Sequence, residues 1–365
     1  MMSARTDRPA ALLALFERHG FATLDTPILQ PAGLFLELSG EDIRRRLFLT
    51  QEADGSEHCL RPEHTIPVCR HHLASGRAAG SYGYCGPVFR QRQGEPGEFL
   101  QAGIESIGAP DALAADAAVL AIALEGLALW SVPDLSVRVG DMDLIEAVMA
   151  ALGLPAPLHR RIVRRLAAGG AIADLLSPPR PAGSDYAGLL AAIEGQDPKA
   201  ARAFVEDVIS IAGITTVGGR SAAEIAERFL SRAANREGAG ERATAVLARY
   251  LAIEAPLPGA ASALRSLARD EGLAMEPALA RFEARLDRLE ARAIPTGDVT
   301  FSARFVRNFD YYTGFVFEAA ARTAPPGRVL AGGGRYDRLL QELGSADPSP
   351  GVGCSFWIDR LESLR

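Results

Sequence analysis

Lysine is nearly absent from this sequence, and its rarity bears on two kinds of chemistry. The chain has 39 basic residues, of which only Lys199 is a lysine. Lys199 follows Gln-Asp-Pro and not the glycine-rich loop that a Walker phosphate site requires. The sequence therefore excludes a Walker loop and argues against Schiff-base chemistry, which depends on a lysine amine.

Cysteine and histidine are scarce as well, with four and six residues. No two cysteines have C-x-x-C spacing and the histidines complete no zinc pattern, so we expect no metal site. No dinucleotide-binding pattern is present, and we expect no cofactor. Reduced, mostly buried thiols are typical of a cytosolic protein.

Long apolar runs are also lacking. The longest, residues 112–130, contains Asp116 and Glu125, whereas a membrane span needs about 20 predominantly apolar residues. The N-terminal apolar run is followed by Glu17 and Arg18, where a signal peptide would have a small-residue cleavage site. We therefore expect a soluble, cytoplasmic protein with no membrane partner.

The composition that remains is that of an ordinary globular protein, with 365 residues and a net charge of -6. This length exceeds what one compact core usually takes, which predicts two domains. The acidic balance argues against a large non-specific nucleic-acid surface, because phosphate contacts need a basic excess.

The first part of the chain mixes helices with strands. Residues 9–19 and 112–130 have helical apolar periods. Strand-like and loop segments follow the first helix through residue 108, with a hairpin signal around residues 53–56. Residues 135–139 alternate like a short strand.

From about residue 140 to 294 the apolar period becomes helical. Residues 221–224 (Ser-Ala-Ala-Glu) have the form of a capping box, and the proline-rich residues 177–183 predict a loop. One further helix is indicated by an apolar stripe at steps of three and four, namely Leu279, Phe282, Leu286 and Leu289.

Strand patterns return near Pro295, at residues 299–306 and 312–319, joined through residues 308–310. The simplest fold class is α+β. In this interpretation residues 1–139 and 295–365 form one discontinuous core domain, and residues 140–294 form a mostly helical insertion.

Two clusters of polar residues in the first half could carry chemistry. Residues 60–65 read Leu-Arg-Pro-Glu-His-Thr, in which a proline fixes the backbone before an acid and a hydroxyl. In the second cluster Phe-Arg-Gln-Arg-Gln (89–93) and a Gly/Pro loop precede Phe-Leu-Gln-Ala-Gly-Ile-Glu (99–105). If residues 99–105 form a strand, Phe99, Gln101 and Glu105 share one face. A surface turn and an exposed polar face are the alternatives.

Two more clusters follow in the second half. Residues 305–314 place Arg307, an aspartate and two tyrosines close together, and arginine can bind carboxylate or phosphate as a two-pronged donor. Residues 331–337 (Ala-Gly-Gly-Gly-Arg-Tyr-Asp) either let the backbone approach a ligand closely or form a hairpin.

Taken in this order, the four clusters resemble the histidyl-tRNA synthetase family. Residues 351–361 are similar to motif 3 of class II aminoacyl-tRNA synthetases, and Pro27 is placed like the proline of motif 1. The resemblance covers about residues 9–139 and 295–365. It implies a class II synthetase-like core, an antiparallel sheet flanked by helices.

The nucleotide side of that site departs from the family pattern. Arg90 matches the motif 2 arginine that holds the ATP α-phosphate, but Arg92 stands where the synthetases have an acid that accepts from the adenine amino group. Arginine has no acceptor. Trp357 replaces a glycine against which adenine packs, while Arg360 matches the motif 3 arginine. The resemblance therefore implies that these four residues form a vestigial nucleotide site with no catalytic residue.

The amino-acid side is retained. The residues that match those enclosing histidine in the synthetase are Glu63, Thr65, Gln101, Glu105, Arg307, Tyr312 and Tyr336. By this carry-over, Glu63, Thr65 and Gln101 would accept from the ammonium and Arg307 would bind the carboxylate. Glu105 with the two tyrosines would pair with the imidazole.

This combination resembles the regulatory subunits of ATP phosphoribosyltransferase, synthetase paralogues that work with a short catalytic subunit in histidine biosynthesis. The chain stops five residues after Arg360, so we expect no C-terminal anticodon-binding domain and no tRNA partner. The resemblance implies a non-enzymatic activator of a short catalytic subunit, with histidine as its feedback ligand. It also implies a homodimer within a hetero-oligomer.

Two other functions remain open on the sequence. A truncated synthetase that adenylates histidine would explain the retained Arg90, Arg307 and Arg360, and histidine-dependent ATP–pyrophosphate exchange would reveal it. An RNA- or protein-binding synthetase-like module is the other alternative. Co-purification of a short phosphoribosyltransferase chain distinguishes a regulatory subunit from such a module.

Overall fold

The computed structural model describes residues 7–38, 41–92, 94–170, 240–307, 311–323, 325 and 327–364. Four features that we singled out in the sequence lie outside these residues. They are the proline-rich loop at 177–183, Lys199, the capping box at 221–224 and the connection at 308–310.

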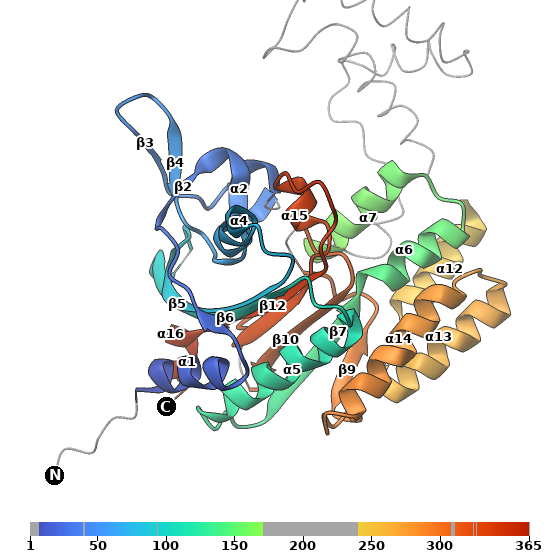
Figure 1. The fold of residues 1–365 in the computed structure, drawn as a ribbon. Coiled ribbons are helices and arrows are strands. Elements are labelled where there is room, and N and C mark those ends of the chain that lie inside the picture. Colours follow the sequence, from blue (N-terminus) through green and yellow to red (C-terminus); the bar gives the residue numbers. More distant parts are fainter. Residues whose placement is uncertain are drawn as a thin grey trace, which may run out of the picture. The chain divides into compact units, whose positions relative to one another are not determined.

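A large mixed sheet forms the centre of the described fold (Figure 1). Its strands, in spatial order, are β1 (Ala22–Thr23), β5 (Gly80–Phe89), β6 (Glu98–Ile107), β12 (Gly351–Trp357), β11 (Ala331–Arg335), β10 (Phe315–Ala321), β7 (Leu135–Asp141), β9 (Val299–Ser302) and β8 (Glu254–Pro256). Only the pairs β1–β5 and β7–β9 are parallel. The expected α+β class and its largely antiparallel sheet are therefore confirmed.

A small second sheet has the order β2-β4-β3, with β2 at Leu29–Pro31, β4 at Glu57–Leu60 and β3 at Leu49–Gln51. β3 and β4 pair in antiparallel register around the turn that contains Gly55, whose φ is 87°. Glycine adopts this left-handed conformation without strain. The predicted hairpin around residues 53–56 is confirmed.

Helices cover both faces of the large sheet (Figure 1). On one face lie α1 (Arg8–Arg18) and α5 (Ala112–Ala128), and on the other lie α4 (Thr65–Ser75), α2 (Ala32–Leu38) and α15 (Leu339–Glu342). α1 and α5 match the predicted helices to within two residues at their ends. Asp111 begins α5 by accepting a 2.9 Å hydrogen bond from the Ala114 N–H.

The remaining described helices are short or come after β7 in the sequence. They are α3 (Glu41–Arg44), α6 (Met142–Ala151), α7 (Ala156–Ala167), α12 (Glu241–Leu251), α13 (Leu257–Glu271), α14 (Glu276–Glu290) and α16 (Ile358–Glu362). α14 carries the predicted apolar stripe, with Leu279, Phe282 and Leu289 buried. It packs against α5 and α6.

One local prediction was wrong. We expected only strands and loops between the first helix and residue 108, but α2, α3 and α4 lie there. The start of α4, Thr-Ile-Pro-Val, is rich in β-branched residues and therefore reads like a strand. The Glu63 carboxylate accepts from the first N–H groups of this helix, and burial against the sheet outweighs the weak local propensity.

The strands after Pro295 are shorter than predicted. β9 ends at Ser302, and β10 begins only at Phe315 because Thr313 is held in a loop. The Thr313 N–H donates to the Arg335 carbonyl at 2.8 Å, and its hydroxyl accepts from the Asp337 N–H at 3.0 Å. β7 separates β9 from β10 in the sheet, so the two are not neighbours.

The chain divides into two compact units, which differ in extent from the predicted domains. The first contains residues 1–151 and 249–365, and the second contains residues 152–248. Residues 252–294, which we placed in the insertion, form β8, α13 and α14 of the first unit, because β8 pairs with β9. Of the second unit the structure describes α7 and the first part of α12, whose inward residues include Leu158, Ile162 and Leu247.

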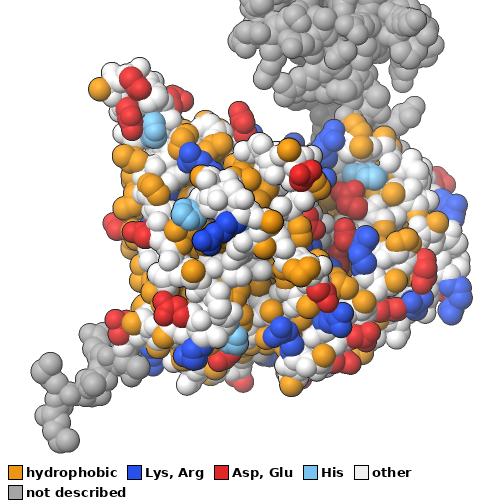
Figure 2. All heavy atoms as spheres, in the orientation of Figure 1, with side chains coloured by type: hydrophobic (Ala, Val, Ile, Leu, Met, Phe, Trp, Pro, Cys, Tyr) orange, Lys and Arg blue, Asp and Glu red, His pale blue; other side chains and the backbone are white. Residues whose placement is uncertain are grey.

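The four cysteines are free thiols, and three of them are buried. Among the described residues no helix is long and apolar enough to cross a bilayer. On the face of the molecule in Figure 2, basic and acidic side chains are interspersed.

Candidate functional site

Strand β6 places the second sequence cluster on the face of the sheet that α4 covers. Gln101 and Glu105 are buried with exposed fractions of 1%, and Phe99 on the same face is 3% exposed. Their shared face is the one that period-two alternation predicts. The alternative of an exposed polar face is therefore wrong.

Glycines on neighbouring strands make room for these side chains. Gly103 lies opposite Tyr84 of β5, and a Cβ at Gly103 would collide with the Tyr84 hydroxyl. Gly353 of β12 lies opposite Glu105, whose carboxylate would occupy the position of its Cβ. The small residues let long polar side chains lie flat across the sheet.

Glu105 is the centre of a buried polar group that we call the Glu105 cluster, made of Glu105, Thr65, Tyr84 and Tyr336. Its carboxylate accepts hydrogen bonds from the Thr65 hydroxyl at 2.7 Å, the Tyr84 hydroxyl at 3.3 Å and the Tyr336 hydroxyl at 2.5 Å. The Tyr84 hydroxyl also lies 2.9 Å from that of Ser355. The structure thus brings together three of the predicted histidine-site residues, from α4, β6 and the end of β11.

Burial raises the pKa of Glu105 to about 8, against the opposing effect of the hydroxyl donors. The nearby Glu63 carboxylate adds to the increase. A carboxyl group with this pKa exchanges a proton close to neutral pH, so it can pair with either protonation state of an imidazole.

Glu63 has hydrogen-bond partners within the chain. Its two carboxylate oxygens accept from the Thr65 N–H at 2.6 Å and the Ile66 N–H at 2.9 Å, at the start of α4. A carboxylate at a helix N-terminus satisfies N–H groups that have no partner within the helix. Burial raises the pKa of Glu63, and these hydrogen bonds with the charge of Arg90 oppose the increase.

Gln101 differs from Glu63 in its hydrogen bonding. Its side-chain oxygen is buried and has no hydrogen-bond partner among the described residues. In the sheet it lies between Gly86 on β5 and Trp357 on β12. Because an unpaired buried acceptor costs about 1–3 kcal/mol, this oxygen is a strong candidate for a ligand contact.

Where Gln101 offers an acceptor, Arg307 offers a hydrogen-bond donor. Its guanidinium donates to the Phe317 carbonyl at 3.1 Å, while its Nε is buried without a hydrogen-bond partner in the described part of the chain. Gly332 provides the space for it, since a Cβ there would collide with Nη1. The guanidinium carbon lies 5.8 Å from the ring centre of Tyr312 and 6.0 Å from that of Trp357.

The predicted nucleotide-site residues gather around a second feature, the aromatic platform formed by Val88, Phe99 and Trp357. Trp357 is 9% exposed. The guanidinium carbon of Arg92 lies 3.9 Å from the ring centre of Phe99, so it covers that ring. Arg92 is fixed there by two hydrogen bonds to the Pro96 carbonyl, at 2.9 and 2.5 Å, and by a 2.6 Å contact with Glu95.

Arg90 and Arg360 flank the platform. Arg90 donates to the Pro62 carbonyl at 2.6 Å, and burial lowers its pKa to about 10. Arg360 donates to the Val329 carbonyl at 3.0 Å, and its guanidinium carbon lies 5.7 Å from the ring centre of Trp357. All four predicted residues are therefore close together, and the chain's own side chains cover both aromatic rings.

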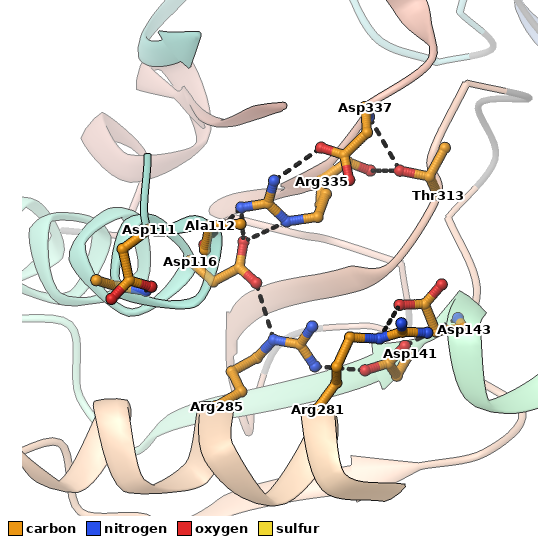
Figure 3. A network of polar contacts seen from close by, with 11 residues as sticks. Asp111, Ala112, Asp116, Asp141, Asp143, Arg281, Arg285, Thr313, Arg335 and Asp337 are labelled. Atoms are coloured by element: carbon orange, nitrogen blue, oxygen red, sulfur yellow. Dashed lines mark hydrogen bonds and ion pairs between the residues drawn. The ribbon is translucent and has the colours of Figure 1, made fainter. Parts of the chain in front are cut away.

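On the opposite face of the sheet lies a buried network of ions, which we call the Asp116 network (Figure 3). Asp116 accepts from Arg335 at 2.6 and 2.9 Å and from Arg285 at 2.8 Å, and Arg285 also donates to Asp141 at 2.5 Å. Arg335 continues to Asp337 at 2.7 Å. Since Tyr336 lies between these last two residues, the network fixes the segment that delivers its hydroxyl to Glu105.

The chain is similar to known proteins along nearly its whole length. A profile of the family described as histidyl-tRNA synthetase matches residues 2–207 and 220–361. A protein of Mesorhizobium japonicum named ATP phosphoribosyltransferase regulatory subunit is 42% identical, over 98% of this chain and 96% of that protein. One of the same name from Brucella anthropi is 40% identical, over 97% and 96%.

The chain belongs to this family of histidyl-tRNA synthetase-like regulatory subunits. The fold agrees as well. A crystal structure from Bacillus halodurans, titled as an ATP phosphoribosyltransferase regulatory subunit/histidyl-tRNA synthetase, superposes with a TM-score of 0.67 at 22% identity. That match covers 98% of this chain and 78% of the other, and it shows the class II synthetase-like fold.

Sequence reasoning missed two residues beside the histidine-site candidates, Tyr84 and His64. Tyr84 lies two residues after Tyr82 on β5 and shares its face, so its inward direction could have been read from the period of that strand. His64 stands between Glu63 and Thr65 in the first sequence cluster, but we gave it no role, because its position depends on α4, which we did not predict.

Proposed function

We propose that this chain is the regulatory subunit of an ATP phosphoribosyltransferase, that it activates a short catalytic subunit, and that it carries feedback inhibition by histidine. It would have no phosphoribosyl transfer or adenylation chemistry of its own. The names of the relatives support the regulatory role. The proposal depends on a contrast between two parts of the site. Polar groups near Glu105 have no hydrogen-bond partner in the described part of the chain, whereas the chain's own side chains cover the rings of the aromatic platform.

Free histidine has the chemistry that the unpaired groups require. Its ammonium would donate to the Gln101 oxygen, its carboxylate would accept from Arg307, and its imidazole would pair with Glu105 in the presence of Tyr336 and Tyr312. Glu63, whose oxygens also accept from α4, would contribute negative charge and a further acceptor near the ammonium. Thr65 would orient Glu105 through their 2.7 Å hydrogen bond.

ATP has no comparable place. Adenine binding at a platform of this kind needs an exposed aromatic face and an acceptor for the amino group. Here Arg92 covers Phe99 and offers only hydrogen-bond donors. The Trp357 indole fills the space beside Phe99. An aromatic side chain of this size buries about 150–250 Å² of surface, which is enough to exclude a purine.

Calorimetric titration with histidine tests the ligand. Wild type should bind, and Arg307→Ala and Glu105→Ala should each weaken binding by about thirtyfold, since a lost charged partner costs on the order of 2 kcal/mol. Unchanged affinity in both variants would place the histidine site elsewhere. Capture of the chain from native extract should also recover a short phosphoribosyltransferase chain, and its absence would contradict the regulatory role.

We also propose a homodimer formed around residues 20–27, which resemble the motif 1 segment that pairs class II subunits. The exposed large hydrophobic side chains among the described residues lie next to this segment and on the adjoining small sheet, at Ile28, Leu29 and Leu49. Burying them against a second copy would remove apolar surface from water. Light scattering that shows a stable monomer at micromolar concentration would contradict the dimer.

A further inference from the structure

His64 is a buried side chain that the proposed histidine site does not yet use. It is 2% exposed, and its ring stacks on Tyr84 with 4.3 Å between ring centres. It lies immediately before α4 but makes no side-chain hydrogen bond that caps the helix. If His64 only packed against its neighbours, neither ring nitrogen would need to stay available. The hydrogen bonds of the two nitrogens therefore decide which role the ring has.

The contacts of the ring identify its tautomer. The His64 Nε2 lies 3.3 Å from the Gly86 carbonyl oxygen. A carbonyl only accepts, so Nε2 carries the proton and Nδ1 has a free lone pair. Burial, with the charges of Arg61 and Arg90, lowers the pKa of His64 to about 3, which keeps the ring neutral. Nδ1 is buried and has no hydrogen-bond partner among the described residues.

The Gln101 oxygen is another unpaired acceptor on this face of the sheet. A Cβ at Gly86 would be 3.3 Å from the His64 Cε1, and Gly86 is the direct cross-strand partner of Gln101. Side chains at such paired positions begin about 4.5–5.5 Å apart. Two unpaired acceptors, from two different segments, thus occupy neighbouring positions on one face of the sheet.

The charged groups around His64 are of both signs, and the positive charges of Arg61 and Arg90 oppose a cation here. Arg61 lies close to His64, but its guanidinium donates to the Thr26 and Pro87 carbonyls and lies 3.6 Å from Asp25. The carboxylates of Glu63 and Glu105 lie on the α4 side. Glu63 already accepts two N–H groups, and the acceptors that have no partner in the described part of the chain are the neutral His64 Nδ1 and Gln101 oxygen.

We propose that the His64 Nδ1, together with the Gln101 oxygen, accepts from the α-ammonium of the bound amino acid, which makes His64 a specificity-determining residue of this chain. The inference rests on the proposed histidine site and adds to it a residue outside the family pattern. A ligand without the ammonium leaves both acceptors unpaired, so the site should discriminate against it.

The test compares two ligands in three proteins by calorimetry. The ligands are histidine and imidazolepropionate, which lacks only the ammonium. The proteins are wild type, His64→Phe, which keeps an aromatic ring on Tyr84 but has no acceptor, and His64→Asn, whose amide oxygen can replace Nδ1. A hydrogen bond to a charged group is worth about 1.5–3 kcal/mol. His64→Phe should therefore bind histidine at least tenfold more weakly than wild type.

The affinity for imidazolepropionate should be the same in all three proteins, and His64→Asn should recover most of the histidine affinity. Equal weakening of both ligands in His64→Phe would assign His64 a packing role and overturn the inference. Unchanged histidine affinity in His64→Phe would also overturn the inference about His64, but it would leave the proposed histidine site standing. If wild type binds no histidine, the proposed function fails first and the inference with it. Should His64→Phe not fold, His64→Leu with the same two ligands replaces it.

Discussion

Two buried polar clusters lie on opposite faces of the same sheet, and they differ in how completely their groups are paired. In the Asp116 network each carboxylate faces a guanidinium, and the side chains of Asp116, Arg285 and Asp141 are at most 4% exposed. Near the Glu105 cluster, by contrast, Gln101, His64 and Arg307 each keep a buried atom without a hydrogen-bond partner in the described part of the chain.

We infer from this difference that the paired network stabilises the fold, whereas the unpaired groups serve a ligand. A fully paired buried network rigidifies the elements that it joins, here β11, α5, α14 and the end of β7. A group left unpaired destabilises the folded protein unless something else pairs with it. The unpaired atoms include both donors and acceptors, which is what a zwitterionic amino acid requires. The comparison predicts opposite consequences for substitutions on the two faces.

The largest effect is expected in the Asp116 network. Asp116→Ala leaves Arg285 and Arg335 buried without their shared carboxylate, and breaking a buried pair in this way costs about 3–5 kcal/mol. Denaturant unfolding should show this loss in the free energy of unfolding. The matched control is Glu283→Ala, which breaks the exposed pair with Arg265 and should cost less than about 1 kcal/mol. Equal effects in both variants would show that the network is not a structural centre.

A smaller effect, which depends on pH, is expected at Glu105. Its pKa is about 8 in the folded protein against about 4.3 in an unfolded chain. The folded state therefore holds the proton more tightly, so this group's contribution to stability is complete below the unfolded pKa and is lost as pH rises toward 8. One group can contribute at most about 1.4 kcal/mol per pH unit.

Glu105→Gln removes this dependence. Unfolding measured between about pH 5 and 8 should show a flatter profile for the variant than for wild type. Glu63, whose pKa burial also raises, remains in the variant, so some slope should persist. Identical profiles in the two proteins would mean that Glu105 ionises as it does in water.

The smallest change in stability is expected at Gln101. Gln101→Met keeps nearly the same shape and removes the unpaired oxygen, so the free energy of unfolding should stay within about 0.5 kcal/mol of wild type or increase. Histidine affinity measured on the same protein should nevertheless fall tenfold or more. A large loss of stability with intact binding would assign Gln101 to the structural side of the comparison.

Local periodicity predicted the elements that carry the site better than it predicted their partners. Strand β6 and helix α14 follow from alternation and from an apolar stripe, which are properties of neighbouring residues. α4 was missed because its helix depends on a cap and on burial. The pairing of Arg285 with Asp116 joins positions 169 residues apart, and no local pattern contains it.

The family motifs brought distant residues together where periodicity could not. They correctly grouped Thr65, Glu105 and Tyr336, which meet in the structure. They did not reveal that Glu63 accepts from α4 or that Arg92 covers Phe99. Both depend on side-chain conformations that a motif does not specify, and these conformations decide which groups remain available to a ligand.

We propose that the amino-acid side of the synthetase-like site is available to histidine, whereas the chain's own side chains fill its nucleotide side. Titration of the wild-type chain with histidine and, separately, with ATP in one calorimetric experiment tests it most directly. We predict that histidine binds and that ATP gives no heat of binding, with or without histidine. Binding of ATP together with histidine-dependent pyrophosphate exchange would contradict the claim, because Arg92 and Trp357 would then leave room for adenine.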